Sequence, residues 1–425
     1  MKKIIFCIYC LFVADGGWAD MYAALNDVYM SNPLIKQARA DVDLAQANLD
    51  SAKTELQPYL GLSGNVGLAQ TQLAGMDFDY APMQYGIEVQ QNIFSGGAMF
   101  AKIKAGHGLA HAAQAQLYAV QQDVFMAAIN AYIEVLNAHE VMDLNENNQN
   151  VLQKYYDLVR DRMRVGMLTQ TDVAQASARL EMAKYGVSDA VAKYDNALET
   201  FRRIYGRVDY KFADIDLDKI DGLFPESVSD AEKDALRNHP VLRTLHAQED
   251  ATRQNITVAR SSMVPSVDVR GAINRVDNVP FLDDITDSRI GVYLKVPLYD
   301  KGNAFANMDK VRANIAGIQE QVINARRVII ENLRSAWNIY QAQEYAITAT
   351  MASVDASKLA LDGVRDEQAR GRRTVLDVLN AEQELLNARV AHVRAKHARI
   401  SAFFAVLSAI GELSPENLGL EIYKK

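Results

Sequence analysis

The second half of this 425-residue chain repeats the pattern of its first half. Pro58 has a counterpart 207 residues later at Pro265, and the motif that begins at Gly166 recurs 205 residues later at Gly371. Landmarks at nearly constant intervals indicate a duplicated supersecondary unit. A chain of this kind must fold so that two copies of one unit pack together.

The N-terminus has the pattern of a secretory signal. Two lysines precede an apolar run at 4–14, which is too short to span a bilayer, and small residues then suit cleavage before Asp20. Both cysteines lie within this signal, so we expect the mature chain to have no disulfide, thiol chemistry or lipid anchor. The predicted organisation is a signal peptide at 1–19, a first repeat at 20–205, an inter-repeat segment at 206–230, a second repeat at 231–410 and a C-terminal tail at 411–425.

Each copy predicts the same order of elements. In the first copy these are a helix at 21–55, strands at 59–69 and 84–94 around a loop, a long helix at 98–164 and a return helix to Tyr205. Apolar residues in the long helix step by threes and fours, which is the seam of a coiled coil. At about 1.5 Å per residue this helix reaches on the order of 100 Å. A second apolar stripe on another face predicts neighbours on both sides.

The predicted strands alternate between apolar and polar side chains. In 84–94 and 289–298 one face is mostly apolar, and these faces superpose when the second copy is shifted by 205 residues. Such segments suit a barrel in the outer membrane, although half-buried strands of a soluble sandwich show the same alternation. Four strands cannot close a barrel, because the smallest single-chain barrels use about eight. If the strands lie in lipid, other copies of the chain must therefore supply the rest.

Composition excludes several other classes of protein. The chain is 49% hydrophobic and 23% charged, which is too apolar for a disordered protein and too charged for a bundle of membrane helices. Its net charge of −8 gives no general attraction to nucleic acid. No motif predicts a catalytic nucleophile, a cofactor or a metal site, so we do not expect an enzyme.

Together these features resemble the TolC family of outer-membrane efflux and secretion proteins. The match covers nearly the whole mature chain and includes the motifs Asn32-Pro33-Leu34, Leu56-Gln57-Pro58, Gln91 to Gly97, Val296 to Tyr299 and Gly371 to Glu382. The resemblance implies a mainly α fold with a small β part. Each chain is then expected to contribute duplicated coiled-coil hairpins and four membrane strands. Three chains form a homotrimer, with a twelve-stranded barrel in outer-membrane lipid and a twelve-helix periplasmic tunnel.

The resemblance also implies function and partners. A protein of this kind is the exit duct of a tripartite efflux or type I secretion system. It works with a periplasmic adaptor of the membrane-fusion type and an inner-membrane transporter of the ABC or RND type.

A gate at the periplasmic end is a further implication of the resemblance. Position by position, it assigns gate roles to Thr171 and Asp172 in the first copy and to Arg373 and Asp377 in the second. Arg373 then bridges toward Thr171, within or between chains, and a ring of three Asp377 carboxylates favours cations. Alternatively, Asp172 and Asp377 cap the return helices, where a carboxylate satisfies free amides. The same aspartate can serve both as a gate residue and as a helix cap.

The chain departs from the family pattern at two gate positions. Asn380 stands where the family has a second aspartate at the constriction, so we expect a weaker negative ring. Gln368 replaces a gating tyrosine, which removes a partner of Asp172. The closed state is therefore expected to depend more on Arg373.

The turns between the paired helices resemble the tips that adaptor proteins bind in the TolC family. The residues assigned to this contact are Gly166, Met167, Leu168 and Thr169 in the first copy, and Gly371, Arg372 and Thr374 in the second. Both glycines are expected to end their helices in a left-handed conformation. A plainer interpretation is that these are only the turns of helical hairpins.

Other functional classes explain the sequence less well. An elongated periplasmic coiled-coil scaffold without a channel accounts for the signal and the seams, but not for four matched strands. A passive porin is contradicted by the number of strands and the amount of helix, and an exported enzyme by the lack of a site.

Overall fold

The computed structural model describes residues 16–73, 75–215, 217, 221–279 and 282–420, so most of the predicted signal, 1–15, lies outside the described residues. The chain divides into two compact units. The first comprises Met1–Gln37, Tyr118–Pro240 and Arg326–Lys425, and the second comprises Ala38–Leu117 and Val241–Ala325. Each unit therefore takes segments from both halves of the sequence.

Three pairs of corresponding helices in the two halves have equal lengths. Helices α2 (Pro33–Thr54) and α6 (Pro240–Ser261) have 22 residues each, α3 (Ala98–Arg164) and α7 (Asn303–Ala369) have 67, and α4 (Gln170–Tyr205) and α8 (Val375–Ile410) have 36. The predicted long helix and return helix are confirmed. Neither long helix contains proline, which would break the backbone ladder. Over the described ranges, no helix has an apolar stretch long enough to cross a bilayer.

The helix predicted at 21–55 is in fact two helices. Helix α1 (Gly16–Ser31) ends before Asn32, and α2 begins at Pro33. Proline fits the first helical position, because the amide that it lacks has no helical partner there. Asn32 Oδ1 accepts a hydrogen bond from Leu34 N at 2.9 Å. The second half repeats this break, since α5 (Val228–Asn238) ends shortly before the proline that starts α6.

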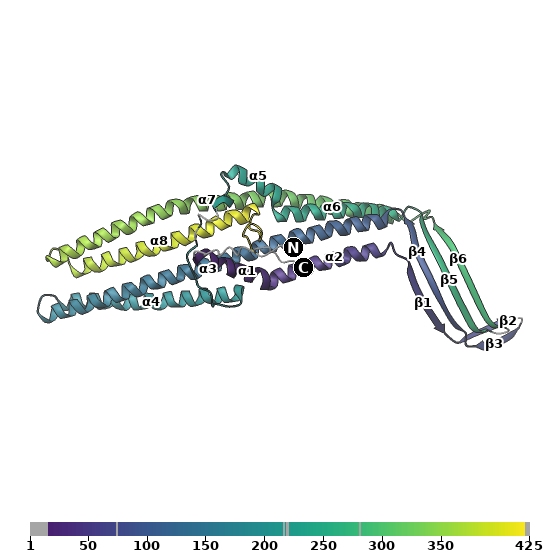
Figure 1. Cartoon of the computed structure of the whole chain (residues 1–425), viewed down its shortest axis with the longest axis horizontal. Coiled ribbons are helices and arrows are strands. Elements are labelled where there is room, and N and C mark those ends of the chain that lie inside the picture. Colours follow the sequence, from purple (N-terminus) through teal and green to yellow (C-terminus); the bar gives the residue numbers. More distant parts are fainter. Residues whose placement is uncertain (1–15, 74, 216, 218–220, 280–281, 421–425) are drawn as a thin grey trace, which may run out of the picture. The chain divides into compact units, whose positions relative to one another are not determined.

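The second unit contains a four-stranded antiparallel sheet (Figure 1). Its order is β1 (Tyr59–Val66), β4 (Met83–Ser95), β5 (Ser266–Val279) and β6 (Leu282–Lys295). Leu62 lies opposite Ile87, which lies opposite Ile273, so these apolar side chains share one face. Leu62 is 82% exposed and Ile290 on β6 is 85% exposed in the single chain. The four predicted strands are confirmed, and their apolar face is uncovered.

Two details of the strand prediction are wrong. The predicted loop between the first two strands holds a separate hairpin of β2 (Ala69–Leu73) and β3 (Met76–Tyr80). Each of these strands has only five residues, which is too short for alternation to be recognised. The last strand ends at Lys295, before the predicted end at 298, because Pro297 has no amide to donate to a sheet.

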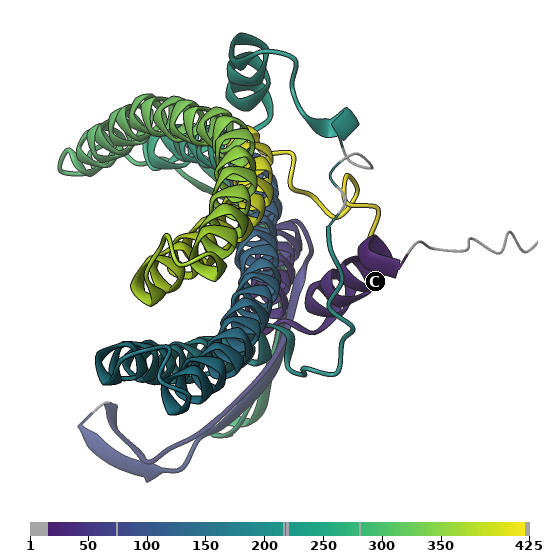
Figure 2. The same cartoon turned by 90° about the vertical axis from the view of Figure 1, so that its left-hand side faces the viewer.

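Aromatic side chains form the core of the first unit where the inter-repeat segment crosses the hairpins. Phe201 on α4 stacks on Tyr205 with ring centroids 3.9 Å apart. Tyr132 on α3 accepts a hydrogen bond from Ala213 N at 3.0 Å and donates one to Ala213 O at 3.2 Å. Figure 2 shows α3 with α4 in blue, α7 with α8 in green and yellow, and α5 along one side of them. These contacts attach the inter-repeat segment to the first hairpin.

Candidate gate at the hairpin tips

The turn between α3 and α4 has the same backbone geometry as the turn between α7 and α8. Gly166 has a φ of +77° and Gly371 a φ of +74°. After the first glycine, Met167 N donates to Arg162 O at 2.9 Å, and the equivalent bond in the second turn has the same length. The predicted left-handed helix ends are therefore confirmed, and they close each long helix with a backbone hydrogen bond.

The exposed side chains of the two turns differ in chemistry. Val165 and Met167 at the first tip are each 71% exposed. Equivalent positions at the second tip carry Arg370 and Arg372, which are also exposed. Leu168 is half-buried and packs against the core below the first tip. The two turns therefore have the same backbone conformation, but the first tip is apolar and the second is basic.

Both predicted gate aspartates cap the return helices. Asp172 Oδ2 accepts hydrogen bonds from Thr169 N at 2.9 Å and from Thr169 Oγ1 at 2.8 Å. Asp377 makes the same pair of bonds with Thr374, at 2.9 and 2.8 Å. The Thr374 amide, with its hydroxyl, holds the pKa of Asp377 below the ordinary range. Capping, the alternative explanation of these aspartates, is thus confirmed, with each threonine as N-cap.

Arg373 is held by its own chain. Its Nε lies 2.8 Å from Glu367 Oε2 on the last turn of α7, and this contact raises the pKa of Arg373. Thr171 is exposed in the first turn of α4. Across the described part of the chain, Arg373 makes its ion pair with Glu367, so the predicted bridge to Thr171 is not formed within one chain.

The two hairpins are joined by a polar contact that sequence analysis missed. Arg179 Nη2 on α4 donates to Asn380 Oδ1 on α8 at 2.8 Å. The sequence singled out Asn380 but not Arg179, because two residues 201 positions apart share no local pattern. This contact links the first copy to the second, one helical turn beyond Asp377.

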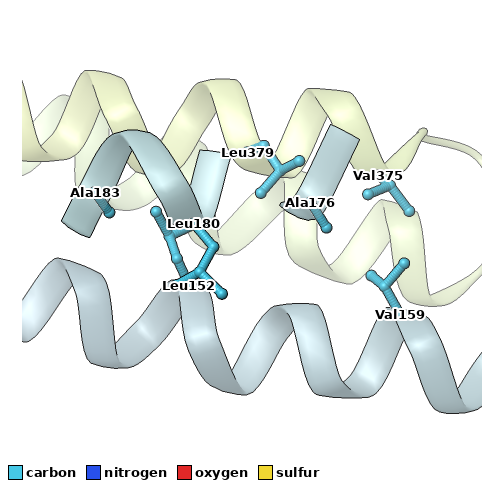
Figure 3. Packing of buried hydrophobic residues seen from close by; sticks show 7 residues of the cluster. All are labelled: Leu152, Val159, Ala176, Leu180, Ala183, Val375 and Leu379. Atoms are coloured by element: carbon cyan, nitrogen blue, oxygen red, sulfur yellow. The ribbon is translucent and has the colours of Figure 1, made fainter. Parts of the chain in front are cut away.

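Below the tips a hydrophobic cluster packs the start of α8 against the first hairpin (Figure 3). Its buried members are Leu152 and Val159 from α3, Ala176, Leu180 and Ala183 from α4, and Val375 and Leu379 from α8. Val378, on another face of α8, belongs to a second cluster with Leu361 of α7 and Leu385. The first turns of α8 are therefore packed on both sides.

Tyr155 on α3 packs against both clusters. Its hydroxyl is buried, and no hydrogen-bond partner for it exists among the described residues. Burial raises the pKa of Tyr155. Nearby, Arg365 of α7 forms an ion pair with Glu382 of α8, whose side chain is largely buried. Sequence periodicity does not reveal that the hydroxyl of Tyr155 lacks a partner among the described residues.

The predicted gate residues thus separate into three local groups. Asp172 lies with Thr169, Asp377 with Thr374, and Arg373 with Glu367. Near the tips, contact between the two halves instead comes from Arg179, Asn380 and the apolar clusters. In the part of the chain that the structure covers, no group of three or more histidine, cysteine or acidic side chains is placed to hold a metal ion.

Comparisons with known proteins agree with this architecture. The model of a family described as "Outer membrane efflux protein" matches residues 24–207 and 232–412. The outer membrane efflux protein BepC of Brucella suis is 27% identical over 402 residues, which cover 94% of this chain and 87% of the relative. The outer membrane protein TolC of Escherichia coli is 23% identical and covers 98% and 88%. The crystal structure of the Campylobacter jejuni CmeC outer membrane channel has a TM-score of 0.82 at 18% identity, covering 93% and 86%.

Proposed function

The chain belongs to the outer membrane efflux protein family, and on that premise we propose that it forms the exit duct of a tripartite export system. The family consists of outer-membrane channels rather than enzymes, and its members work as trimers with partner proteins. One observation carries the proposal: the four-stranded sheet has an uncovered apolar face, and its outer strands β1 and β6 each have one strand neighbour among the described residues.

Sheet geometry supports assembly with other copies of the chain. In lipid, the free edges of β1 and β6 must find partners, because no water is present to satisfy their backbone groups. Three copies supply twelve strands, which is enough to enclose an aqueous lumen. The exposed apolar face, with Leu62 and Ile290, then contacts outer-membrane lipid.

The hairpin tips are the proposed contact for a periplasmic adaptor of the membrane-fusion type. Gly166 to Thr169 and Gly371 to Thr374 are available for this role because they form short, mostly exposed turns. An inner-membrane transporter of the ABC or RND type would complete the system. The exposed apolar and basic side chains at the two tips support a contact with a partner protein, because folding of the turn requires only its glycine and cap residues.

The gate is proposed at the starts of α4 and α8, where Thr171, Asp172, Arg373 and Asp377 lie. Three Asp377 carboxylates in a trimer would place negative charge at the constriction and favour cations. Since Arg373 is tied to Glu367 in one chain, a gating role for Arg373 requires that it contact a neighbouring chain on closure. The cap bonds fix the positions of both aspartates without using all of their oxygen atoms.

Assembly is tested by measuring the mass of the mature protein, extracted from outer membranes in mild detergent, by light scattering corrected for bound detergent. We expect the mass of three chains and, in planar bilayers, discrete channel currents. A monomer that stays in solution without detergent would contradict the proposal. It would favour the alternative of an elongated periplasmic scaffold.

A further inference from the structure

The apolar side chains on the uncovered face of the sheet do not lie at one level on its four strands. Directly opposite residues on neighbouring strands form rows across the sheet, and opposite residues point to the same side. One row on the uncovered face consists of Val66 on β1, Met83 on β4, Asp277 on β5 and Asp284 on β6. This row has exposed apolar side chains at β1 and β4 but carries two carboxylates at β5 and β6. The apolar part of this face, which we call the apolar band, therefore ends at different levels on different strands.

The apolar band lies closer to the helices of this unit on β6 than on β1. On β1 it runs from Leu60, near the helices, to Val66. On β6 it runs from Leu294, near the helices, to Ile290, because Ser288, the next residue on this face, is polar. Ile290 shares a row with Leu60, so the far end of the band moves by three rows, or six residues, from β1 to β6. The near end moves by two rows, or four residues.

A band that moves from strand to strand is expected of strands that are inclined to the membrane normal. The boundary of the hydrocarbon is level, so the lipid-facing apolar residues of inclined strands shift along each successive strand. Strands lie about 4.8 Å apart and rise about 3.3 Å per residue. At a tilt of about 45°, each step shifts the band by about 1.5 residues, or roughly four to five residues over three steps. The shift of four to six residues from β1 to β6 agrees with this tilt.

We propose that β1 pairs with β6 of the adjacent copy in the register that places Leu62 directly opposite Leu294 of the partner subunit. This inference rests on the proposed trimeric barrel and adds the geometry of its closure. Continuing the band from β6 to the next β1 adds a fourth step, which brings the displacement to about six residues per chain. Within one chain Leu62 shares its row with Ser288, and Leu294 lies six residues farther along β6.

Side-chain orientation restricts the alternative registers. Opposite residues point to the same side, so the displacement per chain is an even number of residues, and displacements of four and eight require tilts of about 35° and 55°. A displacement of four would place the apolar Val66 opposite the polar Ser288 of the partner subunit. A displacement of eight would place Leu62 opposite Val296 of the partner subunit, which lies beyond the end of β6. With six residues, Val66 faces Ile290 of the partner subunit, and the apolar band is continuous.

The side chains on the other face of the sheet, which points into the barrel, fit the same register. The register places Gly61, Ser63 and Asn65 opposite Lys295, Tyr293 and Gly291 of the partner subunit, in that order. Each pair combines a larger side chain with a smaller one, and directly opposite side chains on neighbouring strands must share the space between them. The two faces of the sheet therefore favour one register.

The test is disulfide formation between cysteines placed on the two edge strands. Both native cysteines, Cys7 and Cys10, lie in the predicted signal peptide, so introduced cysteines are the only thiols expected in the mature protein. The double variant Leu62→Cys with Leu294→Cys is oxidised with copper-phenanthroline in isolated outer membranes and analysed by non-reducing gel electrophoresis. In one chain β1 and β6 are three strand spacings apart, roughly 14 Å, so a disulfide at these positions joins two copies.

We expect this variant to give about fivefold more linked chains than Leu62→Cys with Val292→Cys or with Val296→Cys, because directly opposite residues lie closest. Ser63→Cys with Tyr293→Cys is the second proposed pair. Rows alternate between shorter and longer Cα distances, so one of the two proposed pairs has the shorter distance. Leu62→Cys with Tyr293→Cys is the matched control and should not link, because its side chains point to opposite faces.

More linkage with Val292→Cys or Val296→Cys than with Leu294→Cys would overturn the register. So would the absence of linkage in both proposed pairs when light scattering shows three chains, and the exit duct would then stand without this register. A monomer by light scattering would instead contradict the trimeric duct itself, and the register would fail with it.

Discussion

Arg179 and Asn380 form a hydrogen bond of 2.8 Å that joins α4 of the first repeat to α8 of the second. Asn380 occupies a position where the resemblance leads one to expect an aspartate, and here it accepts from a cation of its own chain. The guanidinium of Arg179 therefore lies one helical turn from Asp377. A positive charge at this place reduces the negative field of the proposed constriction.

If the hairpins separate when the channel opens, Arg179→Gln should increase the time spent open. The lost bond is exposed and worth on the order of 1 kcal/mol, so the expected change is about fivefold. Single-channel recording in planar bilayers measures it. Lys184→Gln is the control, because Lys184 on the same helix forms its ion pair with Glu181, one turn away on α4 itself. Equal open times in native protein and Arg179→Gln would remove this bond from the gate.

Asp377→Asn separates the gate role of this residue from its cap role. Asparagine keeps an oxygen for the Thr374 amide but removes the charge, so we expect lower cation preference with little loss of stability. Thr374→Ala does the reverse: it keeps the charge but costs the α8 N-terminus about 1 kcal/mol. Reversal potentials measure selectivity, and hydrogen exchange in the first turn of α8 measures the cap. Unchanged selectivity in Asp377→Asn would leave Asp377 with the cap role alone.

Arg373→Ala should raise conductance if Arg373 contacts a neighbouring chain in the closed trimer. Because Glu367 competes for the same guanidinium, Glu367→Gln should free Arg373 for that contact and lower conductance. The two variants thus change conductance in opposite directions. An intersubunit role for Arg373 would be contradicted if both variants changed the conductance in the same direction, or if neither variant changed it.

Gly411→Ala should destabilise the protein more than Gly206→Ala does. Both glycines end helices in the left-handed region, with φ of +96° and +80°. An added Cβ at Gly411 lies 3.1 Å from His239 Cα, whereas nothing lies within 4 Å at Gly206. Gly206→Ala costs only backbone strain, about 1 kcal/mol, and Gly411→Ala adds crowding to that cost. The midpoints of thermal unfolding in mild detergent give the comparison, and equal losses would contradict it.

His239 makes stability depend on pH below neutrality. Burial lowers its pKa from the ordinary 6.5 to about 4, so the folded state disfavours protonation. The unfolded state therefore binds the proton first, and stability falls as the pH drops from about 6.5 to about 4, by up to about 3 kcal/mol. The thermal midpoint of native protein should fall from pH 7.5 to pH 5, and His239→Gln should reduce that fall. An identical fall in both proteins would exclude His239 as the cause.

The sequence predicted those features that depend on short stretches of chain. Period-two alternation located the four strands of the sheet, and the proline-free stripe located α3 to its observed bounds. The caps were predictable because threonine and aspartate three residues apart satisfy free amides at a helix start. The break at Asn32 was missed, because a single helix was predicted over 21–55, although Pro33 is a local signal for it, since proline favours the first position of a helix.

Contacts between distant segments were not predictable in the same way. Arg373 pairs with Glu367 rather than Thr171, although each residue lies where the sequence placed it. Which of several exposed side chains meet is decided by the rotation of one helix against another, and periodicity does not report that angle.

By itself, the sequence determined a duplicated chain of long hairpins with four outward-facing apolar strands, because hydrophobic period, proline and glycine act within a few residues. Only the tertiary structure decided that Arg179 meets Asn380 and that the hydroxyl of Tyr155 is buried without a partner among the described residues. These features depend on the packing of segments more than two hundred residues apart, and such packing produces no recognisable pattern in the local sequence.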